Sequence, residues 1–446
     1  MWFRRDLRLA DNPALLEAAA SGEVLPLFVL DPRLWGPAGP SRRCHLADSL
    51  RALDAALRQR QSGLSILEGD PVEQVVRAAQ EVGAERVHVA ADYGPYGSER
   101  DAAVEQALDD AGIALVRTGS PYAVAPGRVK NGSGDHYKVF TPFSRAWADH
   151  GWRQPVDAPT GVTWLRLEKG TVDVPEPERP DGLDLPPAGE RAALERWEEF
   201  LDDLDDYDDA RDRPDLDGTS RMSVHLKYGE VHPRTLLADL AGRRSAGAAS
   251  YRTELAWREF YADVLHQQPE TARDYLKSEF ARMDYDEPGE QLEAWQEGRT
   301  GFPIVDAGMR QLRATGWMHN RVRMIVASFL VKDLHLEWQH GARHFMHWLV
   351  DGDLASNQHG WQWTAGSGTD ASPFFRVFNP TSQGKKFDPQ GRYVRRWVEE
   401  LADTEQVPDP HEPDADTRDL VGYPQPLVDH KAERAEALDR WERIRG

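Results

Sequence analysis

The thirteen residues from Asp351 to Trp363 carry the side chains best suited to chemistry. They hold two carboxylates, an asparagine amide, an imidazole and two indoles. Carboxylates are costly to bury without positive partners, and the segment from Trp317 to Met324 offers two guanidinium groups beside apolar side chains. We infer that these two segments wall a pocket for a flat, polar cofactor.

An ion pair is expected inside this pocket. Arg323 shares a helix face with Asn320 and could bind Asp351 or Asp353 through two parallel hydrogen bonds. An isolated structural salt bridge is the alternative. Two aspartates around one glycine, followed closely by Asn357, favour a cofactor clamp.

Two further motifs have polar groups at helical spacing. Glu254, Trp257, Arg258 and Tyr261 share one helix face, which favours a lined cavity over a weak surface ion pair. The segment 218–223, Gly-Thr-Ser-Arg-Met-Ser, opens a helical pattern, where hydroxyls, amides and an arginine can bind phosphate. For this second motif alone, ordinary helix capping is the favoured explanation.

Other aromatic and histidine residues are less informative. Spacing does not separate simple core packing from an electron relay for Trp338, Trp361, Trp363 and Tyr285. Four histidines have spacing that resembles a metal site, but core or solvated roles are favoured for His335, His340, His344 and His347. His319 is expected to be a hydrogen-bonded core histidine. We predict no metal site.

Composition sets the class of protein. The chain has 446 residues, of which 40% are apolar and 29% charged, as in ordinary globular proteins of two or three domains. No apolar run is long enough to cross a membrane, and the first residues lack the apolar core of a signal peptide. The single cysteine, Cys44, excludes an intrachain disulfide and a four-cysteine zinc site. A cytoplasmic location is predicted.

The net charge of -21 argues against binding of nucleic acid at first sight. The charge is unevenly spread, however. Residues 173–217 contain 18 acidic and 5 basic side chains, whereas residues 310–397 contain 12 basic and 6 acidic ones. Because the shape of the field steers a polyanion more than the total charge does, binding of DNA remains open beside a simple solvated acidic linker.

The order of patterns predicts the fold. Apolar runs at 24–30, 64–67, 86–91 and 113–116 alternate with helical patterns at 43–60, 71–82 and 98–111, which is typical of a parallel sheet with helices on both faces. The first strand is very short, since Met1 directly precedes Trp2 and Phe3. No Gly-x-Gly-x-x-Gly follows it, so a nicotinamide-type site is not expected.

We therefore predict an α/β domain with a doubly wound parallel sheet over residues 1–121 and a Pro- and Gly-rich surface connector over 122–189. Residues 190–446 are predicted to form an all-α domain. Within it, residues 303–315 should form a helix that ends before Gly316, and residues 322–330 carry the apolar stripe of a buried helix face.

Taken together, these segments resemble the photolyase/cryptochrome family, and within it the microbial class I photolyases that split cyclobutane pyrimidine dimers. The resemblance runs from WFRRDLRL at 2–9 to YPQP at 423–426 and is densest over 207–397. It implies a monomeric enzyme, a deoxyribodipyrimidine photo-lyase, that repairs DNA with FAD in its reduced form. FAD would lie folded in the helical domain.

The resemblance also implies which residues surround FAD: Tyr207, Thr219, Ser220, Arg221, Met222, Ser223, Tyr251, Glu254, Arg258, Trp317, Asn320, Arg323, Asp351, Gly352, Asp353 and Asn357. Tyr251 stands where many members carry Trp. Asn357 matches the amide that faces flavin N5 in repair enzymes. The cofactor supplies the photochemistry and the protein supplies orientation and electrostatics.

A dimer must leave the duplex to be repaired, and photolyases are an established case of such base flipping. The resemblance implies a lesion pocket of Glu254, Trp257, Asn320, Arg321, Met324 and Trp363. Strand contacts are implied for Arg211, Trp257, Arg321 and Gln383. The two indoles could stack on the flipped bases. Burial would favour a protonated Glu254, which could donate to carbonyl oxygens as they gain charge.

The family's electron relay to the flavin matches Trp361 and Trp338, and its third position falls on Tyr285, where Trp is usual. Oxidation of tyrosine requires that its proton leave, so photoreduction is expected to be altered while repair by reduced flavin is not. A light-harvesting antenna is expected in the α/β domain. Arg42, Asp92 and Lys227 match sites for 8-hydroxy-5-deazaflavin, which we favour over methenyltetrahydrofolate because Ser98-Glu99 replaces the Asn-Glu pair of folate sites.

Three other functions remain as alternatives. A cryptochrome-type blue-light receptor usually needs a signalling tail, whereas residues 428–445 form a final charged helical pattern. Repair of (6-4) photoproducts relies on a His pair in the lesion pocket, whereas His319 is followed by Asn320. A flavoprotein that binds DNA without repairing it is the third.

Overall fold

A computed structural model describes residues 1–369 and 375–445, and the chain folds into two compact units. The first contains most of the N-terminal sequence: Met1–Pro180, Leu185–Asp205 and Ser220–Pro269. The second contains Asp181–Asp184, Asp206–Thr219 and Glu270–Gly446. Most of the helices between residues 190 and 269 thus belong to the same compact unit as the sheet. The domain boundaries at 121 and 189 stay a prediction.

The strands of the first unit pair in parallel, as predicted. One sheet has the order β1 (Trp2–Phe3), β3 (Leu27–Leu30), β4 (Ser65–Glu68), and β5 (Arg86–Val89) pairs with β6 (Ala114–Arg117). Because β5 also packs beside β1, the spatial order is β4-β3-β1-β5-β6. The chain first moves one way from β1 and then the other way, which is a doubly wound arrangement. A separate pair joins β2 (Glu23–Val24) to β7 (Thr163–Trp164).

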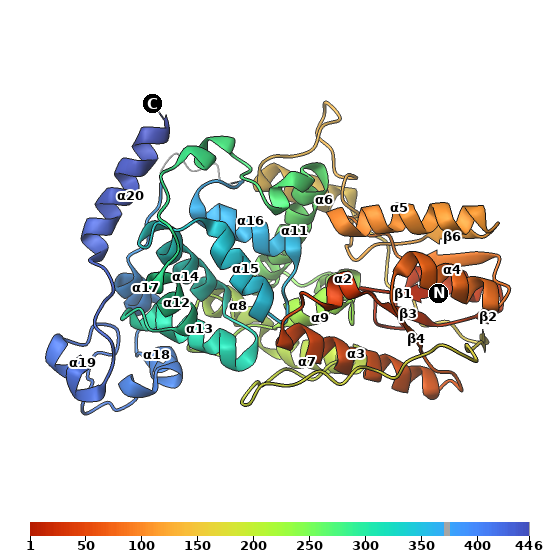
Figure 1. Cartoon of the computed structure of the whole chain (residues 1–446), viewed down its shortest axis with the longest axis horizontal. Helices are drawn as coiled ribbons and strands as arrows, with labels where there is room; N and C mark the ends of the chain where they lie inside the picture. Colours follow the sequence, from red (N-terminus) through yellow and green to blue (C-terminus); the bar gives the residue numbers. More distant parts are fainter. Residues whose placement is uncertain (370–374, 446) are drawn as a thin grey trace. The chain divides into compact units, whose positions relative to one another are not determined.

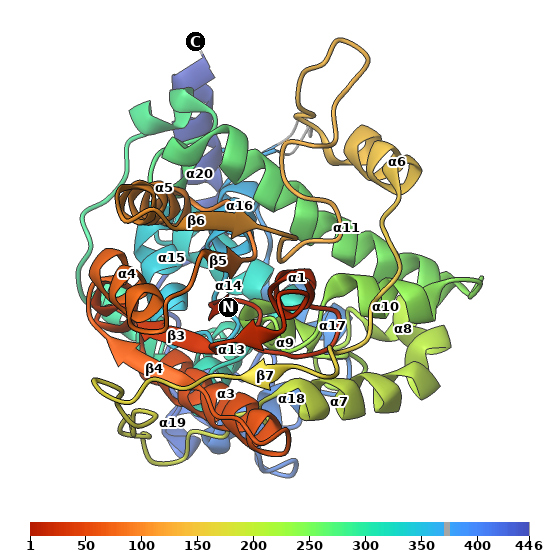
Figure 2. The same cartoon turned by 90° about the vertical axis from the view of Figure 1, so that its right-hand side faces the viewer.

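Helices cover both faces of these strands (Figures 1 and 2). α3 (Pro40–Arg58) lies on one face, and α4 (Pro71–Glu81) and α5 (Pro95–Asp110) lie together on the other. Each begins with proline, whose missing N–H costs nothing in a first turn. The strands contribute a buried apolar core that includes Leu27, Val29, Leu67, Val87 and Val89. The predicted α/β fold is confirmed.

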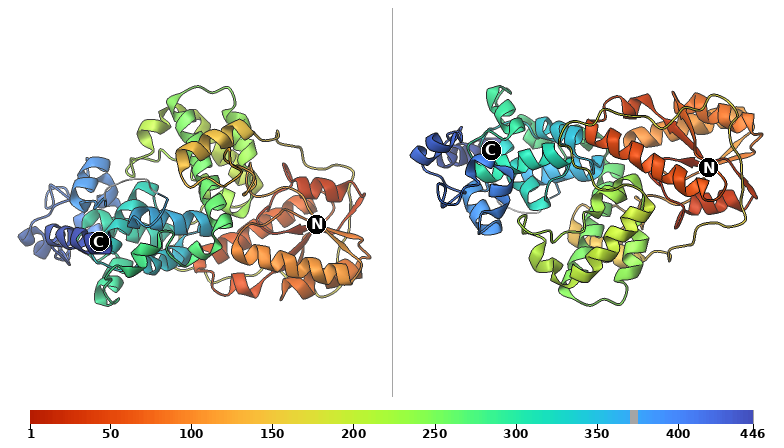
Figure 3. Two further views of the ribbon diagram at one scale, coloured as in Figure 1. Left: turned by 90° about the horizontal axis from the view of Figure 1, so that it is seen from above. Right: turned by 90° about the horizontal axis from the view of Figure 1, so that it is seen from below.

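The predicted connector contains a helix that the sequence analysis missed. α6 (Phe140–His150) packs against the long α11 (Ala246–Gln267), and Figures 2 and 3 show the two side by side. Pro142 hides this helix in the sequence, yet it lies in the first turn, where an amide proton is not needed. The other helices here are α1 (Pro13–Ala19), α2 (Pro32–Trp35), α7 (Glu190–Asp203), α9 (Met222–Tyr228) and α10 (Pro233–Leu240).

The described residues of the second unit form helices and connecting loops without a strand, as predicted for an all-α domain. α13 (Pro303–Thr315) ends at Gly316, which has a φ of 63° as a left-handed cap requires. α14 (Asn320–Lys332) packs against α13, α15 (Trp338–Trp348) and α16 (Leu354–Ala365). The remaining helices are α8 (Tyr207–Ala210), α12 (Glu290–Glu297), α17 (Pro380–Phe387), α18 (Arg392–Trp397), α19 (Ala415–Val421) and α20 (His430–Arg445). Among the described residues, no helix has the length and apolar character to span a membrane.

Candidate functional site

The predicted cofactor residues are divided between the two units. The first unit holds Ser220, Arg221, Met222, Ser223, Tyr251, Glu254 and Arg258. The second holds Tyr207, Thr219, Trp317, Asn320, Arg323, Asp351, Gly352, Asp353 and Asn357. The hydrogen bonds and ion pairs within each group show which polar atoms are already engaged by the protein.

In the first unit, two predicted residues far apart in sequence meet. The hydroxyl oxygens of Ser220 and Tyr251 lie 2.8 Å apart, and Ser220 Oγ also accepts a hydrogen bond from the Met222 amide at 3.2 Å. Arg221, between them, has a left-handed φ of 57° and an exposed side chain. Such backbone strain in a non-glycine residue is concentrated at ligand sites.

Arg258 is bound by backbone carbonyls. Its guanidinium donates to Pro121 O at 3.1 Å and to Leu226 O at 3.3 Å, and it lies over the Tyr122 ring at 4.7 Å. It therefore ties α11 both to the segment after β6 and to α9. Glu254, one turn before it on α11, is half-buried.

Trp257 has one face covered by an aromatic ring that the sequence analysis missed. Phe140, the first residue of α6, stacks on the indole with ring centres 3.6 Å apart and an interplanar angle of 6°. Tyr261 contacts the same indole at a tilt, 5.4 Å away. If a flipped base stacks on Trp257, as the resemblance implies, it must use the remaining face or displace Phe140.

Replacing Trp257 with alanine is expected to weaken binding of dimer-containing DNA by roughly 1–3 kcal/mol, the usual contribution of one stacked base. Fluorescence anisotropy with labelled DNA measures this, and Trp35→Ala, on the separate helix α2, is the control expected to bind normally. Equal affinities of Trp257→Ala and the unaltered protein would exclude this indole from lesion binding.

In the second unit, Arg323 pairs with Asp351 as predicted, but by a single hydrogen bond. Arg323 Nη2 donates to Asp351 Oδ2 at 2.8 Å, while Nε donates to Met318 O at 2.8 Å. The predicted two-point fork is wrong because this carbonyl takes the second N–H. The Asp351 side chain is 2% exposed, and its Oδ1 has no partner among the described residues. Such an oxygen requires a donor, since an unpaired buried acceptor is costly.

Asp353 and Asn357 orient α16. Asp353 accepts from the Ser356 amide at 3.2 Å and so caps the helix start. The Asn357 amide donates to Ala342 O at 3.1 Å and to Gln358 Oε1 at 2.8 Å. The buried Asn357 is thereby fixed against α15.

The acidic segment, residues 173–217, forms ion pairs with arginines of the basic segment, residues 310–397. Arg321, a predicted lesion and strand contact, binds Asp212 through two hydrogen bonds of 3.2 and 2.8 Å. Asp215 lies between Arg213 and Arg392, 2.7 and 2.5 Å from their Nη2 atoms. Residues 206–217 therefore neutralise some of the positive charge that the sequence indicated.

The remaining predicted lesion and strand residues lie at the surface or half-buried. Asn320 is exposed at the start of α14, and Gln383 is half-buried on α17. The Arg211 guanidinium lies 5.7 Å from the centre of the Tyr207 ring. Trp363 is half-buried with the Arg376 guanidinium 6.0 Å from its ring centre.

His319 is structural. Its Nδ1 accepts from the Arg321 amide at 3.2 Å and caps α14. Burial lowers the pKa of this imidazole to about 4, so it is neutral at physiological pH. This confirms the predicted core role. It also makes His319 a poor proton donor.

Trp361 and Trp338 are both buried in the apolar core of the second unit. Gly341 lies three residues after Trp338 on the same face of α15, and a Cβ there would come within 2.0 Å of Trp361 Cη2. Glycine thus lets the Trp361 indole approach the turn that carries Trp338. Neither indole N–H has an acceptor among the described residues.

The third predicted relay residue, Tyr285, contacts another tyrosine. Tyr275 lies with its ring centre 6.2 Å from that of Tyr285, nearly parallel at 14°, and also 6.2 Å from Trp338 at 83°. The sequence analysis missed Tyr275, since it lies in a segment with no clear periodicity.

The predicted antenna residues have different surroundings. Asp92 binds Arg100 at 3.2 Å and accepts from the Gly94 amide at 3.2 Å. Burial opposes its charge, but Arg4, Arg5 and Arg100 outweigh burial and lower the Asp92 pKa to about 2. Its carboxylate is thus already engaged by protein. Arg42 and Lys227 are half-buried, and Arg42 Nε has no partner among the described residues.

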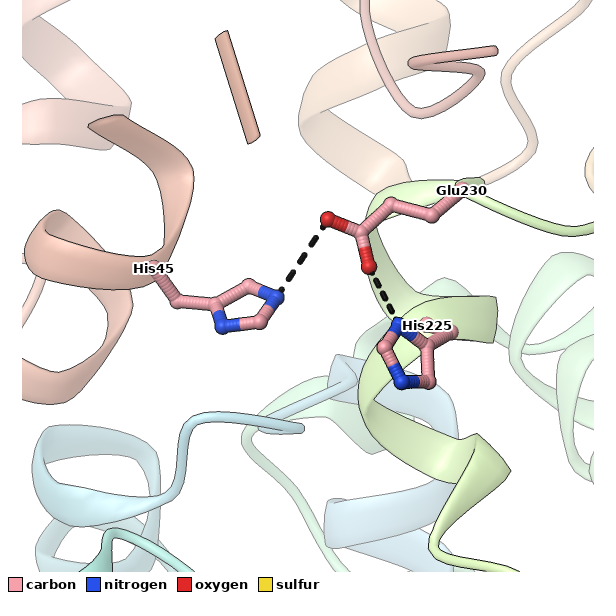
Figure 4. Close-up of side chains that lie close together, drawn as sticks. All are labelled: His45, His225 and Glu230. Atoms are coloured by element: carbon pink, nitrogen blue, oxygen red, sulfur yellow. Dashed lines mark hydrogen bonds and ion pairs between the residues drawn. The ribbon is translucent and has the colours of Figure 1, made fainter. Parts of the chain in front are cut away.

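A buried cluster of two histidines and a glutamate lies within one helical turn of each of these two cations in the sequence (Figure 4). His45 of α3 is three residues after Arg42, and His225 of α9 is two before Lys227. Glu230 lies between them, with Oε2 2.5 Å from His225 Nδ1 and Oε1 3.4 Å from His45 Nε2.

Hydrogen bonds already satisfy the carboxylate of this cluster. Ser49 Oγ and the Gly189 amide donate to Glu230 Oε1 at 2.6 and 2.7 Å. Burial would raise the pKa of Glu230, but the hydrogen bonds and charges of His225 and His45 lower it well below its usual range. The three ligand atoms are near enough for a metal ion, yet the short His225–Glu230 bond is one that a metal would have to break.

Comparison with known proteins agrees with this architecture. A DNA photolyase family model matches residues 1–160, and the FAD binding domain of DNA photolyase matches residues 251–443. Over all of its length, the chain is 42% identical to the deoxyribodipyrimidine photo-lyase of Streptomyces griseus and 39% identical to that of Escherichia coli K12, and it covers 98% of each.

Solved structures give the same result. A class III photolyase from Agrobacterium tumefaciens superposes with a TM-score of 0.93 at 37% identity, covering all of this chain and 97% of that one. A photolyase from Sulfolobus tokodaii with two FAD molecules has a TM-score of 0.84 at 29% identity, covering 99% of both chains. The chain belongs to the DNA photolyase family.

Proposed function

We propose that the protein is a deoxyribodipyrimidine photo-lyase, a light-driven enzyme that splits cyclobutane pyrimidine dimers in DNA. The end-to-end identity with two curated enzymes of that name carries this proposal. Its assignment to class I, its monomeric state and its cytoplasmic location stay predictions. A class III enzyme is among its structural relatives.

The predicted cofactor residues of the second unit fit FAD. Asp351 Oδ1 is a buried acceptor that lacks a donor among the described residues, and FAD carries N–H donors on both its rings. Arg323 fixes the other oxygen of this carboxylate, and Asn357 is anchored nearby on α16. When bound, reduced FAD supplies the electron that opens the dimer under blue light. The protein residues hold the two reactants and exclude water.

We propose that the dimer itself is bound by five residues: Glu254, Trp257, Asn320, Met324 and Trp363. Trp257 and Trp363 offer aromatic faces for the splayed bases. Glu254 and Asn320 would hydrogen-bond the base edges, and a protonated Glu254 would donate to the carbonyl oxygens as they become negative. Arg321 would reach DNA only if its pairing with Asp212 opens or is shared.

For the antenna we propose 8-hydroxy-5-deazaflavin, held by Arg42 and Lys227. Both cations are half-buried on helices of the first unit. Asp92 contributes by fixing Arg100 and the start of α5. The absorption spectrum of the purified protein distinguishes this chromophore from a folate.

Repair under controlled light tests the proposed function. The reduced protein should restore dimer-containing DNA under blue light and leave it unchanged in the dark. Dimer content can be measured by cleavage with a dimer-specific nuclease, with undamaged DNA as the control. Repair in the dark, or no repair in blue light, would contradict the proposal.

A further inference from the structure

Tyr275 is the aromatic side chain that joins Trp338 to Tyr285. Its ring meets Trp338 edge to face and lies nearly parallel to Tyr285, with both ring centres 6.2 Å away. All three residues belong to the second unit. If Trp338 loses an electron, Tyr275 is therefore a neighbouring side chain that can replace it.

Tyr275 also has a base in place. Its phenol donates a hydrogen bond to Glu337 Oε1 at 3.1 Å. Glu337 is the N-cap residue of α15, but its side chain makes no capping bond to the helix. The carboxylate is directed instead to the tyrosine, beside the residue that would be oxidised.

Trp338 lacks an equivalent route for its proton. Its Nε1 is buried and has no acceptor among the described residues. An oxidised indole that keeps its proton remains a radical cation, which is a stronger oxidant than the neutral radical. The surroundings of Trp338 thus favour onward oxidation of a neighbour.

We propose that Tyr275 reduces the Trp338 radical cation and passes its proton to Glu337. In this step one electron moves from the Tyr275 phenol to Trp338, the phenolic O–H bond breaks, and the proton forms a new bond to the Glu337 carboxylate. The products are neutral Trp338, a neutral Tyr275 radical and a protonated Glu337. The inference rests on the proposed function, because photoexcited oxidised flavin, acting through Trp361, is the oxidant of Trp338.

Proton transfer is required because the phenol does not ionise beforehand. Burial, together with Tyr285 and Glu337, raises the pKa of Tyr275 far above its usual value. Burial also raises the pKa of Tyr285, to about 12. Tyr285, half-buried and hydrogen-bonded to Tyr275, is then a second donor rather than the direct partner of Trp338.

Electron paramagnetic resonance of the illuminated, FAD-loaded protein tests the inference. The unaltered protein should give a tyrosyl radical, Tyr275→Phe should lose it, and Tyr285→Phe should keep it. Glu337→Gln keeps a hydrogen-bond acceptor but removes the base, so transient absorption should show formation of the tyrosyl radical slowed by about 100-fold, the lower end of what a positioned base contributes. The matched controls, Tyr137→Phe and Glu290→Gln, should behave as the unaltered protein.

The opposite pattern overturns the inference. A tyrosyl radical that survives in Tyr275→Phe but disappears in Tyr285→Phe would show that Tyr285 reduces Trp338 directly. An unchanged rate in Glu337→Gln would remove the carboxylate from the step. Persistence of a tryptophan radical in the unaltered protein would refute the tyrosine step while leaving the relay and repair intact. Failure of repair by chemically reduced protein would instead refute the proposed function.

Discussion

Replacing Trp361 with phenylalanine is expected to reduce light-driven reduction of the flavin by at least about 100-fold, since an increase of only about 2.7 kcal/mol in the barrier has that effect. Phenylalanine keeps an aromatic ring in the core but is far harder to oxidise than tryptophan. Trp361 is buried on α16 and packs against Gly341 of the helix that carries Trp338. Repair by protein that has been reduced chemically should be retained, because that step needs no relay.

The control for this variant is Trp295→Phe. Trp295 is equally buried and contacts Trp361 at 6.1 Å, but its indole N–H donates to Val326 O at 3.0 Å. It should retain photoreduction. Flash photolysis measures the flavin signal, and thermal unfolding checks that both variants fold. Photoreduction of Trp361→Phe at the unaltered rate would contradict the relay.

Replacing Arg323 with alanine is expected to lower the free energy of unfolding by about 3 kcal/mol and to abolish retention of FAD. The substitution removes the partner of a carboxylate that is 2% exposed, and breaking a buried pair in this way costs about 3–5 kcal/mol. We use the lower end of this range because the Arg323 side chain is 24% exposed, so the pair is only partly buried. Denaturant titration measures the stability, and flavin absorbance after gel filtration measures retention.

A double variant separates charge from packing. Arg323→Ala combined with Asp351→Asn removes the unpaired charge, so it should be more stable than Arg323→Ala by at least about 1 kcal/mol. Arg343→Ala, an exposed arginine on α15, is the control expected to change neither property. Normal stability and FAD retention in Arg323→Ala would contradict the assigned role of the pair.

Much of the fold could be predicted because local signals are strong where they occur. Residues 303–315 were predicted as a helix with the bounds that α13 has, since proline begins it and glycine ends it. Each of the four apolar runs overlaps a parallel strand that extends at most one residue beyond the run. α6 was missed because proline and glycine dominate its surroundings. That α7, α9, α10 and α11 belong to the same compact unit as the sheet could not be predicted, since it depends on which apolar faces meet.

In the candidate site, too, some features could be predicted from the sequence and others could not. The Arg323–Asp351 pair follows from opposite charges in two motifs, but its single-bond geometry depends on the Met318 carbonyl, which no sequence pattern shows. Phe140 and Tyr275 are isolated aromatics whose contacts arise only from tertiary packing. The pairing of Arg321 with Asp212 joins residues 109 positions apart, so it could not be predicted from spacing.

The excited-state lifetime of the reduced, FAD-loaded protein tests the central claim most directly. If an electron passes from the flavin to a bound dimer, saturating dimer-containing DNA should shorten the lifetime of the flavin fluorescence. Undamaged DNA of the same sequence should leave it unchanged. A lifetime that is identical with both DNAs, at concentrations where binding of the dimer is complete, would contradict light-driven repair by this protein.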